Sequence, residues 1–335
     1  MREASRGQMS DHPTNSRGSR IRQVVVVTGA AIALVLVGIL IGTRLPGRGA
    51  PTTQPTTPAQ QAPAPAAPPA APAVATVPDL DSRKTTVFRL ERTGKLDSAL
   101  AVCLQLLQDC QSRLGDRALE TAGVADQYAW LLMKTGALDK AEALARSAYQ
   151  AAAESNSGDL KVMRERRSTL AGILIAAGRL DEAAAIYANR PVPTQWGVTQ
   201  TFQGSFVADD GKAHVLVFWE AWCPHCAKAM PQLEALDKQY AGRGINIMGL
   251  TQETQNATDD DVNRFIREKG IHFPIVKESG RTASYFGATA VPAFRIIEKG
   301  RLIWEGYAPT VDRISTRMLD GLVAALHKSK TASIS

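Results

Sequence analysis

The chain has 335 residues and a formal net charge of +7, and 44% of its residues are hydrophobic. Residues 1–48 hold seven arginines and two acidic residues, so this segment carries +5 of the charge and the other 287 residues only +2. The main body shows no basic stripe with interleaved aromatic residues. The sequence therefore gives no support to nucleic acid as a partner.

An uncharged stretch of nineteen residues covers positions 24–42. As a helix it is long enough to cross most of the hydrocarbon core of a bilayer. Arginines are concentrated before it, which predicts that the N-terminus lies in the cytoplasm. We expect a basic cytoplasmic segment at 1–22 and a single-pass membrane anchor at 23–43. A cleaved signal peptide is the alternative, although the apolar run is longer than is usual in one.

Proline marks the next segment. Ten of the eighteen prolines lie within 46–78, among Ala, Thr and Gln. Such a composition cannot bury a core and is typical of an extended, semi-rigid spacer. We predict a linker over 44–81 that holds the rest of the chain outside the cytoplasm, where disulfide chemistry is common.

A six-residue pattern, G-x-L-D-x-A, occurs three times at a spacing of 42 residues, beginning at Gly94, Gly136 and Gly178. We expect each Gly to end a helix in the left-handed conformation and each Leu to pack under the turn. Each Asp is expected to cap the next helix, and each Ala to allow close helix contact. Helix–turn–helix units repeated in this way stack into a solenoid.

These strings resemble tetratricopeptide repeats, in a form with a 42-residue period. The resemblance covers about 82–190 and implies an all-α repeat domain that binds a segment of a partner protein in a concave groove. A compact helical spacer is the alternative.

Cys103 and Cys110 fall on one expected helix, 97–113, and are too far apart along it to form a disulfide with each other. We interpret them as buried core residues, because free cysteine is often buried. A redox relay or a crosslink to another chain is the alternative.

Pro191 and Pro193 end the helical region, and strands then alternate with helices over 191–330. Strands are expected at 215–219, 245–251, 293–298 and 302–307. Helices are expected at 226–240, 259–269, 281–286 and 311–327. The pattern predicts an α/β sandwich of three layers, with a hairpin near Gly300 and a final helix.

The tetrapeptide Cys223-Pro224-His225-Cys226 lies where an expected strand leads into a helix. The free N–H groups and the dipole of a helix start favour an anion, so we predict that Cys223 is the nucleophile and Cys226 its disulfide partner. We expect the Cys223 sulfur to face solvent. His225 can stabilise a thiolate further. Structural zinc would need two more ligands, and Cu(I) capture by the thiols is a minor alternative.

The string F-W-E-A-W-C-P-H-C at 218–226, with Val291-Pro292 further along, resembles thioredoxin-fold domains of the TlpA and ResA branch of extracytoplasmic thiol oxidoreductases. The C-P-H-C tetrapeptide is similar to that of DsbA. The resemblance implies a thioredoxin fold, a cis bond before Pro292 and a Val291 backbone that docks an extended substrate strand. We also name three side chains that tune the reactive sulfur: Trp222, Pro224, which lacks an N–H, and His225.

Two acidic residues of these families are missing. Val217 stands where thioredoxins have a buried acid, six residues before the first cysteine. Ala229 stands where the TlpA and ResA branch usually has Glu, three residues after the second. Both acids help to deprotonate the second cysteine. We name Glu220 and Glu253 as possible proton acceptors in their place, and expect a slow reductant because Cys226 should ionise poorly.

The sequence thus predicts a membrane-anchored thiol-disulfide oxidoreductase with its C-terminal domains in the periplasm, held by the inner membrane. Its redox centre is the pair Cys223 and Cys226, with no dissociable cofactor and no metal. Expected partners are protein thiols or disulfides, a membrane or extracytoplasmic redox protein, and a protein bound by the repeats. The direction stays open between a reductase of the cytochrome c assembly type and an oxidase.

Two other functions are weighed against this one. In an adaptor, the repeats recruit a partner and the redox centre only gates the contact. A peroxidase fits poorly, because the cysteine motif lacks the P-x-x-x-T-x-x-C environment of peroxide-reducing relatives of the fold.

Overall fold

The computed structural model describes residues 76–155, 159–208, 210–307 and 314–332. The predicted segment 1–22, the anchor 23–43 and nearly all of the linker 44–81 lie outside these residues. Among the helices that are described, none is both long and apolar enough to span a bilayer.

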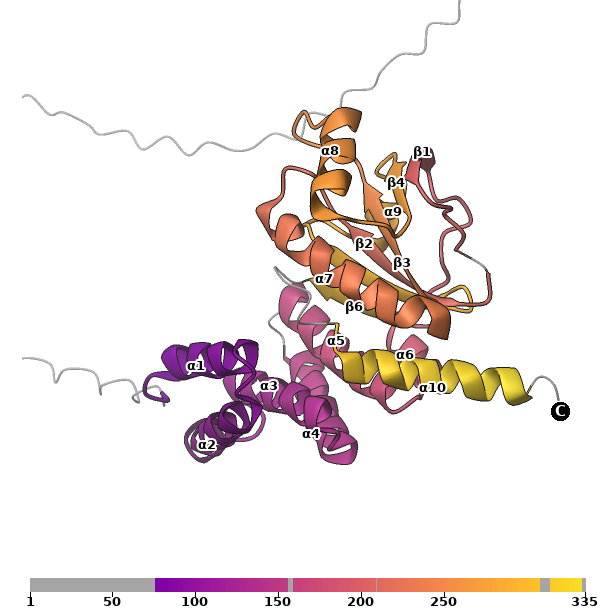
Figure 1. Cartoon of the computed structure of the whole chain (residues 1–335). Helices are drawn as coiled ribbons and strands as arrows, with labels where there is room; N and C mark the ends of the chain where they lie inside the picture. The colour runs from indigo at the N-terminus through magenta and orange to yellow at the C-terminus, as the bar shows by residue number, and fades with distance from the viewer. Residues whose placement is uncertain (1–75, 156–158, 209, 308–313, 333–335) are drawn as a thin grey trace, which may run out of the picture. The chain divides into compact units, whose positions relative to one another are not determined.

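Six helices form three consecutive pairs in the first half of the described chain (Figure 1). The pairs are α1 (Leu80–Arg92) with α2 (Leu96–Leu114), α3 (Leu119–Thr135) with α4 (Leu138–Glu154), and α5 (Leu160–Ala176) with α6 (Leu180–Ile186). Each G-x-L-D-x-A string forms the turn within one pair. The first helix begins at Leu80, one residue before the predicted end of the linker at 81.

The glycine of each turn adopts the predicted left-handed conformation, with φ of 74° at Gly94, 88° at Gly136 and 73° at Gly178. The alanines of the pattern are completely buried between helices: Ala99, Ala141 and Ala183.

The predicted caps are wrong. The N-cap residues of the second helices are Lys95, Ala137 and Arg179, and none accepts a side-chain hydrogen bond from the helix. The reason is that the Leu of the pattern is already helical, which places each Asp in the first turn. Its negative charge there still favours the helix start.

The second half contains one six-stranded sheet in the order β1-β4-β3-β2-β5-β6. The strands are β1 (Val198–Gln203), β2 (Ala213–Phe218), β3 (Ile245–Thr251), β4 (Ile275–Glu278), β5 (Ala293–Glu298) and β6 (Arg301–Tyr307). Strands β2, β3 and β4 run parallel, whereas β1, β5 and β6 pair antiparallel with their neighbours. The helices are α7 (Pro224–Tyr240), α8 (Asp259–Lys269), α9 (Arg281–Phe286) and α10 (Thr316–Ala332), with a short 3₁₀ helix at Ala241–Arg243.

Helices cover both faces of the sheet. On one face, Phe286 of α9 packs against Phe218 of β2, with ring centroids 6.2 Å apart. Trp304 of β6 points to the opposite face, because side chains alternate along a strand and Tyr307 shares the face of Phe218. Trp304 and Met318 of α10 both lie against Gly172 of α5. This is the predicted three-layer sandwich.

Three elements differ from the predictions. Strands β1 and β4 were not expected, because β1 is largely polar and β4 has only four residues, two of them charged. Helix α10 begins at Thr316 and not at 311. The Ser315 carbonyl accepts the first helical hydrogen bond, from Leu319 N–H at 3.1 Å, so Ser315 takes the N-cap position that serine favours.

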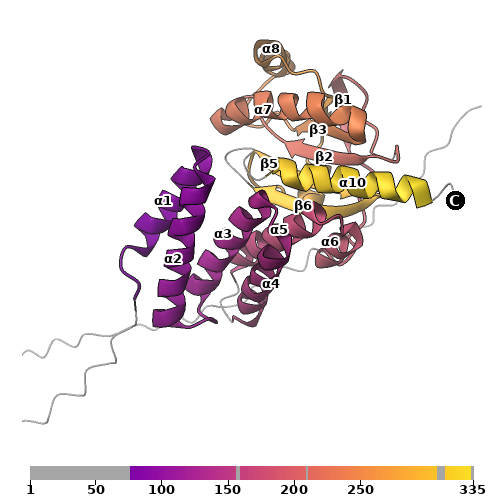
Figure 2. The ribbon, with the colours of Figure 1, turned by 60° about the horizontal axis from the view of Figure 1, so that its bottom comes forward.

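Helices α3 to α6 share one hydrophobic core with the sheet, whereas α1 and α2 pack with part of α3 in a second cluster. Helices α5 and α6 pack on β6, and α5 also packs on α10 (Figure 2). Trp304 Nε1 donates a hydrogen bond to the Ser168 carbonyl at 3.0 Å. The segment after α6 covers the outer edge of β6 through a bridge between Pro191 and Arg301. All described residues belong to one compact unit, and the division at 190/191 stays a prediction.

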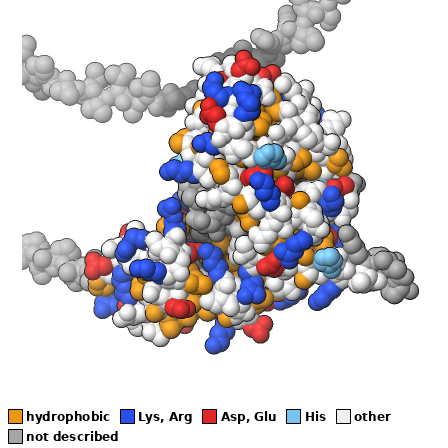
Figure 3. Space-filling model, in the orientation of Figure 1, with side chains coloured by type: hydrophobic (Ala, Val, Ile, Leu, Met, Phe, Trp, Pro, Cys, Tyr) orange, Lys and Arg blue, Asp and Glu red, His pale blue; other side chains and the backbone are white. Residues whose placement is uncertain are grey.

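Charges of both signs are mixed over the surface. On the face drawn in Figure 3, Lys and Arg side chains lie among Asp and Glu side chains. Elsewhere in the described chain, surface charges form ion pairs, such as Arg146 with Glu142 at 2.8 Å. Exposed pairs of this kind add little to the free energy of folding.

Candidate redox site

The site begins where β2 ends. All residues of β2 are buried, and Trp219, which follows it, packs against Phe265 of α8 with ring centroids 4.8 Å apart. Gly249 of β3 makes room for this indole, because a Cβ at that position would lie 2.9 Å from Trp219 Nε1. The packing fixes the end of the strand and so the start of the turn that carries the cysteines.

Cys223 is the N-cap residue of α7, and Pro224 occupies the start of the helix. The Cys223 Sγ accepts a hydrogen bond from the Cys226 N–H at 3.3 Å. This N–H is one of those at a helix start that lack a partner within the helix. The positive end of the helix dipole therefore lies against this sulfur.

The expectation that the Cys223 sulfur faces solvent is wrong, since the residue is only 3% exposed. The side chain turns inward, and Sγ lies 3.6 Å from the carbonyl oxygen of Val291. The Val291 carbonyl therefore lies against this sulfur.

Cys226, one turn further along α7, is fully buried, and both cysteines are free thiols in this structure. Burial raises the pKa of Cys226 well above its ordinary value, and the side-chain hydrogen bond with Cys223 raises it further. Glu220 acts on this pKa in both directions, since a hydrogen bond with its backbone lowers the pKa of Cys226 and its negative charge raises it. Cys226 is therefore protonated at neutral pH, as a resolving cysteine would be before it reacts.

The peptide bond between Val291 and Pro292 is cis, as the family resemblance implied. Pro292 is buried and Val291 is half-buried, immediately before β5. Their position against Cys223 places a backbone carbonyl beside the reactive sulfur.

The three side chains named as tuning residues lie at the surface around the cysteines: Trp222, Pro224 and His225. Trp222 is 40% exposed, and its Nε1 donates a hydrogen bond to the Thr254 hydroxyl at 3.2 Å. Their roles in tuning stay predictions.

Glu220 is buried and turned toward the loop after β3. Its carboxylate accepts hydrogen bonds from the N–H groups of Gln252 and Thr254, each at 3.0 Å, and from the Thr251 hydroxyl at 3.3 Å. Within the part of the chain that is described, no cation pairs with it. The carboxylate is thus a buried negative charge next to the redox pair, held by backbone donors.

Glu253, the other acid named from the sequence, is placed differently. Its carboxylate forms an ion pair with Lys277 of β4. Burial raises the pKa of Glu253, and the nearby Asp259 raises it further. Of the two acids, Glu220 is the one whose charge acts on Cys226.

The sequence did not single out Glu278, at the end of β4. This carboxylate is buried and accepts a hydrogen bond from the Thr282 N–H at 2.9 Å, which holds the start of α9. Burial raises the pKa of Glu278, and the charge of Glu220 adds to the shift. The residue was missed because the short strand that carries it has no alternating hydrophobic pattern.

Cys103 and Cys110 are completely buried free thiols in the core of the first helices, as predicted. Among the residues that the structure describes, no three metal-ligating side chains gather into one group.

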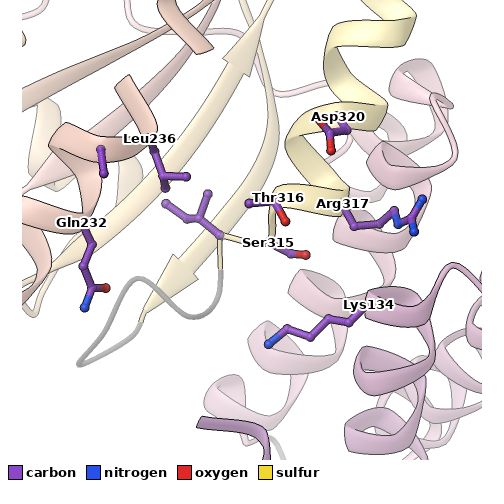
Figure 4. Close-up of a pocket in the computed structure, with 9 residues that line it drawn as sticks. Lys134, Gln232, Leu236, Ser315, Thr316, Arg317 and Asp320 are labelled. Carbon is purple, nitrogen blue, oxygen red and sulfur yellow. The ribbon is translucent and has the colours of Figure 1, made fainter. Parts of the chain in front are cut away.

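A cavity of about 630 Å³ lies between α3, α7 and α10. Figure 4 shows Lys134 of α3 opposite Gln232 of α7, with Arg317 and Asp320 on α10. Neither Cys223 nor Cys226 lines this cavity, so it is separate from the redox pair.

A buried C-x-x-C pair at the start of a helix, facing a cis-proline loop beside a sheet of this order, defines a thioredoxin-like domain. Residues 194–304 match the model of the AhpC/TSA family.

Several curated proteins are similar to this part of the chain. Thiol-disulfide oxidoreductase ResA of Bacillus anthracis is 31% identical over 90 residues, 27% of this chain and 50% of that protein. Sporulation thiol-disulfide oxidoreductase A of Bacillus subtilis is 25% identical over 107 residues, 31% of this chain and 65% of that protein. The chain spans about half the length of most of these relatives.

Solved structures also match. A thiol-disulfide isomerase from Corynebacterium glutamicum has 20% identity and a TM-score of 0.37, over 41% of this chain and 98% of its own. StoA from Bacillus subtilis has 21% identity and a TM-score of 0.33, over 37% of this chain and 98% of its own.

Proposed function

We propose that this protein is a membrane-anchored, extracytoplasmic thiol-disulfide oxidoreductase that acts on protein substrates. The observation that carries the proposal is the setting of Cys223. Its sulfur accepts the Cys226 N–H at a helix start and faces the Val291 carbonyl across the cis-proline loop. The names of the curated relatives support the same activity.

In the reducing direction, the Cys223 thiolate attacks one sulfur of a substrate disulfide. The substrate S–S bond breaks, a mixed disulfide forms and the released thiolate takes up a proton. Cys226 then gives up its proton and attacks the Cys223 sulfur, which releases the second substrate sulfur. Two electrons pass from the protein dithiol to the substrate, and the oxidising direction is the reverse.

Because burial raises the pKa of Cys226, the resolving step needs a proton acceptor near this thiol. Glu220 is the candidate, since it is the buried carboxylate whose charge acts on Cys226. The Val291 backbone would dock the substrate strand while the exchange proceeds.

The primary test is the activity of the Cys223→Ser variant toward a disulfide-bonded protein. We expect at least a thousandfold loss, because the thiolate is the nucleophile in such exchange. Full activity of this variant would overturn the proposal.

The direction of electron transfer follows from the reduction potential of the Cys223–Cys226 pair against glutathione. A value near roughly −120 mV, as in DsbA, assigns an oxidase. A value near roughly −270 mV, as in thioredoxin, assigns a reductase, of which cytochrome c assembly is the expected setting.

A second candidate function, an adaptor, is favoured by a groove of about 340 Å³ on the inner faces of α1, α3 and α5. It is lined by Phe88, Trp130 and Arg166 among others, in the position where tetratricopeptide-like repeats bind partner segments. The test uses the full chain with Cys223→Ser and Cys226→Ser. An adaptor keeps its partner in this variant and loses it on Phe88→Glu, whereas a partner held by disulfide exchange is lost with the cysteines.

A further inference from the structure

Helix α5 of the third pair reaches the edge of the redox site. The docking loop, which ends with Val291 and Pro292, leads directly into β5. The first residue of β5, Ala293, is paired with Tyr307 at the end of β6. Helix α5 packs along β6 (Figure 1). The chain of neighbours therefore runs from Cys223 through Val291 and Ala293 to Tyr307, and from there to α5.

Tyr307 is the residue through which α5 meets this loop. The Arg164 guanidinium lies over its ring, 4.6 Å from the centroid. The buried Arg295 lies at the same distance, and the Tyr307 hydroxyl donates to the Gly287 carbonyl at 2.5 Å. The ring is thus fixed between Arg164 of α5 and the carbonyl of Gly287, which precedes Val291 by four residues.

A pocket of about 140 Å³ opens between α5 and the end of β6. Lys161 and Arg164, one turn apart on the same face of α5, line it together with Tyr307 and Glu305. The Glu305 carboxylate is compensated, since it forms an ion pair with Arg167. In the described part of the chain, neither Lys161 nor Arg164 has a carboxylate within ion-pair distance.

Glu165 also borders this pocket, but it is exposed and equally lines the groove on the inner faces of α1, α3 and α5. Asp159, the N-cap residue of α5, accepts hydrogen bonds from the N–H groups of Lys161 and Val162 and does not line this pocket. Among the described residues, Lys161 and Arg164 therefore supply the basic side of the pocket. An exposed apolar side chain, Leu160 at 76%, stands at the start of the same helix.

We propose that the first turns of α5, with Lys161 and Arg164, form a second part of the substrate-binding surface and bind an acidic segment next to the reactive cysteine of a protein substrate. This rests on the proposed thiol-disulfide exchange activity and specifies its substrate class. It also gives the helical region a direct part in substrate choice, because the basic pair belongs to its third helix pair.

The test compares two peptide disulfides of the same length, one with Asp and Glu and one with Lys beside the reactive cysteine. We expect the full chain to exchange the acidic peptide about fivefold faster in kcat/KM, a preference of the size that two exposed charge pairs supply. The preference should shrink at high salt, where charges are screened. Charge reversal by Lys161→Glu with Arg164→Glu should invert it.

Controls separate this inference from the proposed function. Hydroxyethyl disulfide, which is small and uncharged, should react equally with wild type and variant. Lys140→Glu, an exposed reversal on α4, should leave the peptide preference unchanged. If Arg164→Glu weakens the packing on Tyr307, Lys161→Glu alone should still reduce the preference.

Equal rates for the two peptides in the wild-type chain would overturn the inference and leave the oxidoreductase function standing. If the full chain reacts with none of the disulfides, hydroxyethyl disulfide included, the proposed oxidoreductase function itself is overturned.

Discussion

Two thiols one helical turn apart have opposite environments. The Cys223 sulfur receives an N–H hydrogen bond at the start of α7, which favours a negative charge. Cys226 is fully buried, and burial raises its pKa. These environments fit the proposed roles, in which Cys223 attacks and Cys226 stays protonated until a mixed disulfide forms.

Glu220→Gln tests the influence of the buried carboxylate on Cys226. Removal of its charge should lower the pKa of Cys226. The measurement is the ultraviolet absorbance of the thiolate against pH, in a Cys223→Ser background that leaves one titrating thiol in the site. Glu253→Gln is the control, because that carboxylate is paired with Lys277. An unchanged midpoint in Glu220→Gln would contradict the account.

Cys103 provides a pH prediction for stability. Burial raises the pKa of its thiol to about 12. The contribution of the protonated thiol to folding stability is fully present below the pKa of the unfolded chain, about 8.5. It is lost as pH rises from there through the pKa of the folded protein. Between about pH 8 and about pH 10, reduced wild type should lose about 2 kcal/mol more unfolding free energy than Cys103→Ala. Equal losses in denaturant titrations would show that the thiol is not effectively buried.

Several residues of the site were predictable because their chemistry depends on local sequence. The C-x-x-C spacing at a strand–helix junction identified Cys223 and Cys226, and the family resemblance identified Pro292. The inward direction of the Cys223 sulfur was not predictable. It depends on the Val291 carbonyl, which lies 68 residues away in the sequence.

At the scale of elements, the helix pairs depend on the conformation of one residue in each turn. The pattern at a 42-residue period showed where each helix ends, because left-handed backbone strongly favours glycine. It did not show where the next helix begins, since a helical Leu and a capping Asp produce the same letters. The four-residue strand β4 was missed for a similar reason, because a short charged strand leaves no periodic signal.

Gly94→Ala should lower the unfolding free energy by about 1–2 kcal/mol, because an alanine at φ of 74° is strained. A Cβ at this position meets no atom within 4 Å, so conformation alone is tested. The matched control is Gly242→Ala, which is equally uncrowded but does not have positive φ. It should cause no loss in chemical denaturation. A loss of the same size in both variants would contradict the explanation.

At the scale of the whole molecule, the paired helices and the sheet domain are joined by a close backbone contact between α5 and α10. A Cβ at Gly321 of α10 would lie 2.4 Å from the carbonyl oxygen of Ile175 and 2.5 Å from that of Ala176, both in α5. The sequence suggested two separate units on a shared chain. It could not show this contact, because neither helix pattern carries information about its partner.

Gly321→Ala should therefore push α10 away from α5 and lower the unfolding free energy by about 2–3 kcal/mol. Residues of α5, α10 and the sheet should unfold in one transition in wild type, since they share a core. Hydrogen exchange of α5 and α10 would report the local loss. If the amides of both helices exchange as slowly in Gly321→Ala as in wild type, the close contact does not contribute to their stability.

The most direct measurement is mass spectrometry of a trapped intermediate. The full chain carrying Cys226→Ser, incubated with a disulfide-bonded peptide, should accumulate one mixed disulfide on Cys223, because the resolving thiol is absent. The other thiols, Cys103 and Cys110, are buried and should remain unmodified. An adduct on either of them, or no adduct on Cys223, would contradict the account.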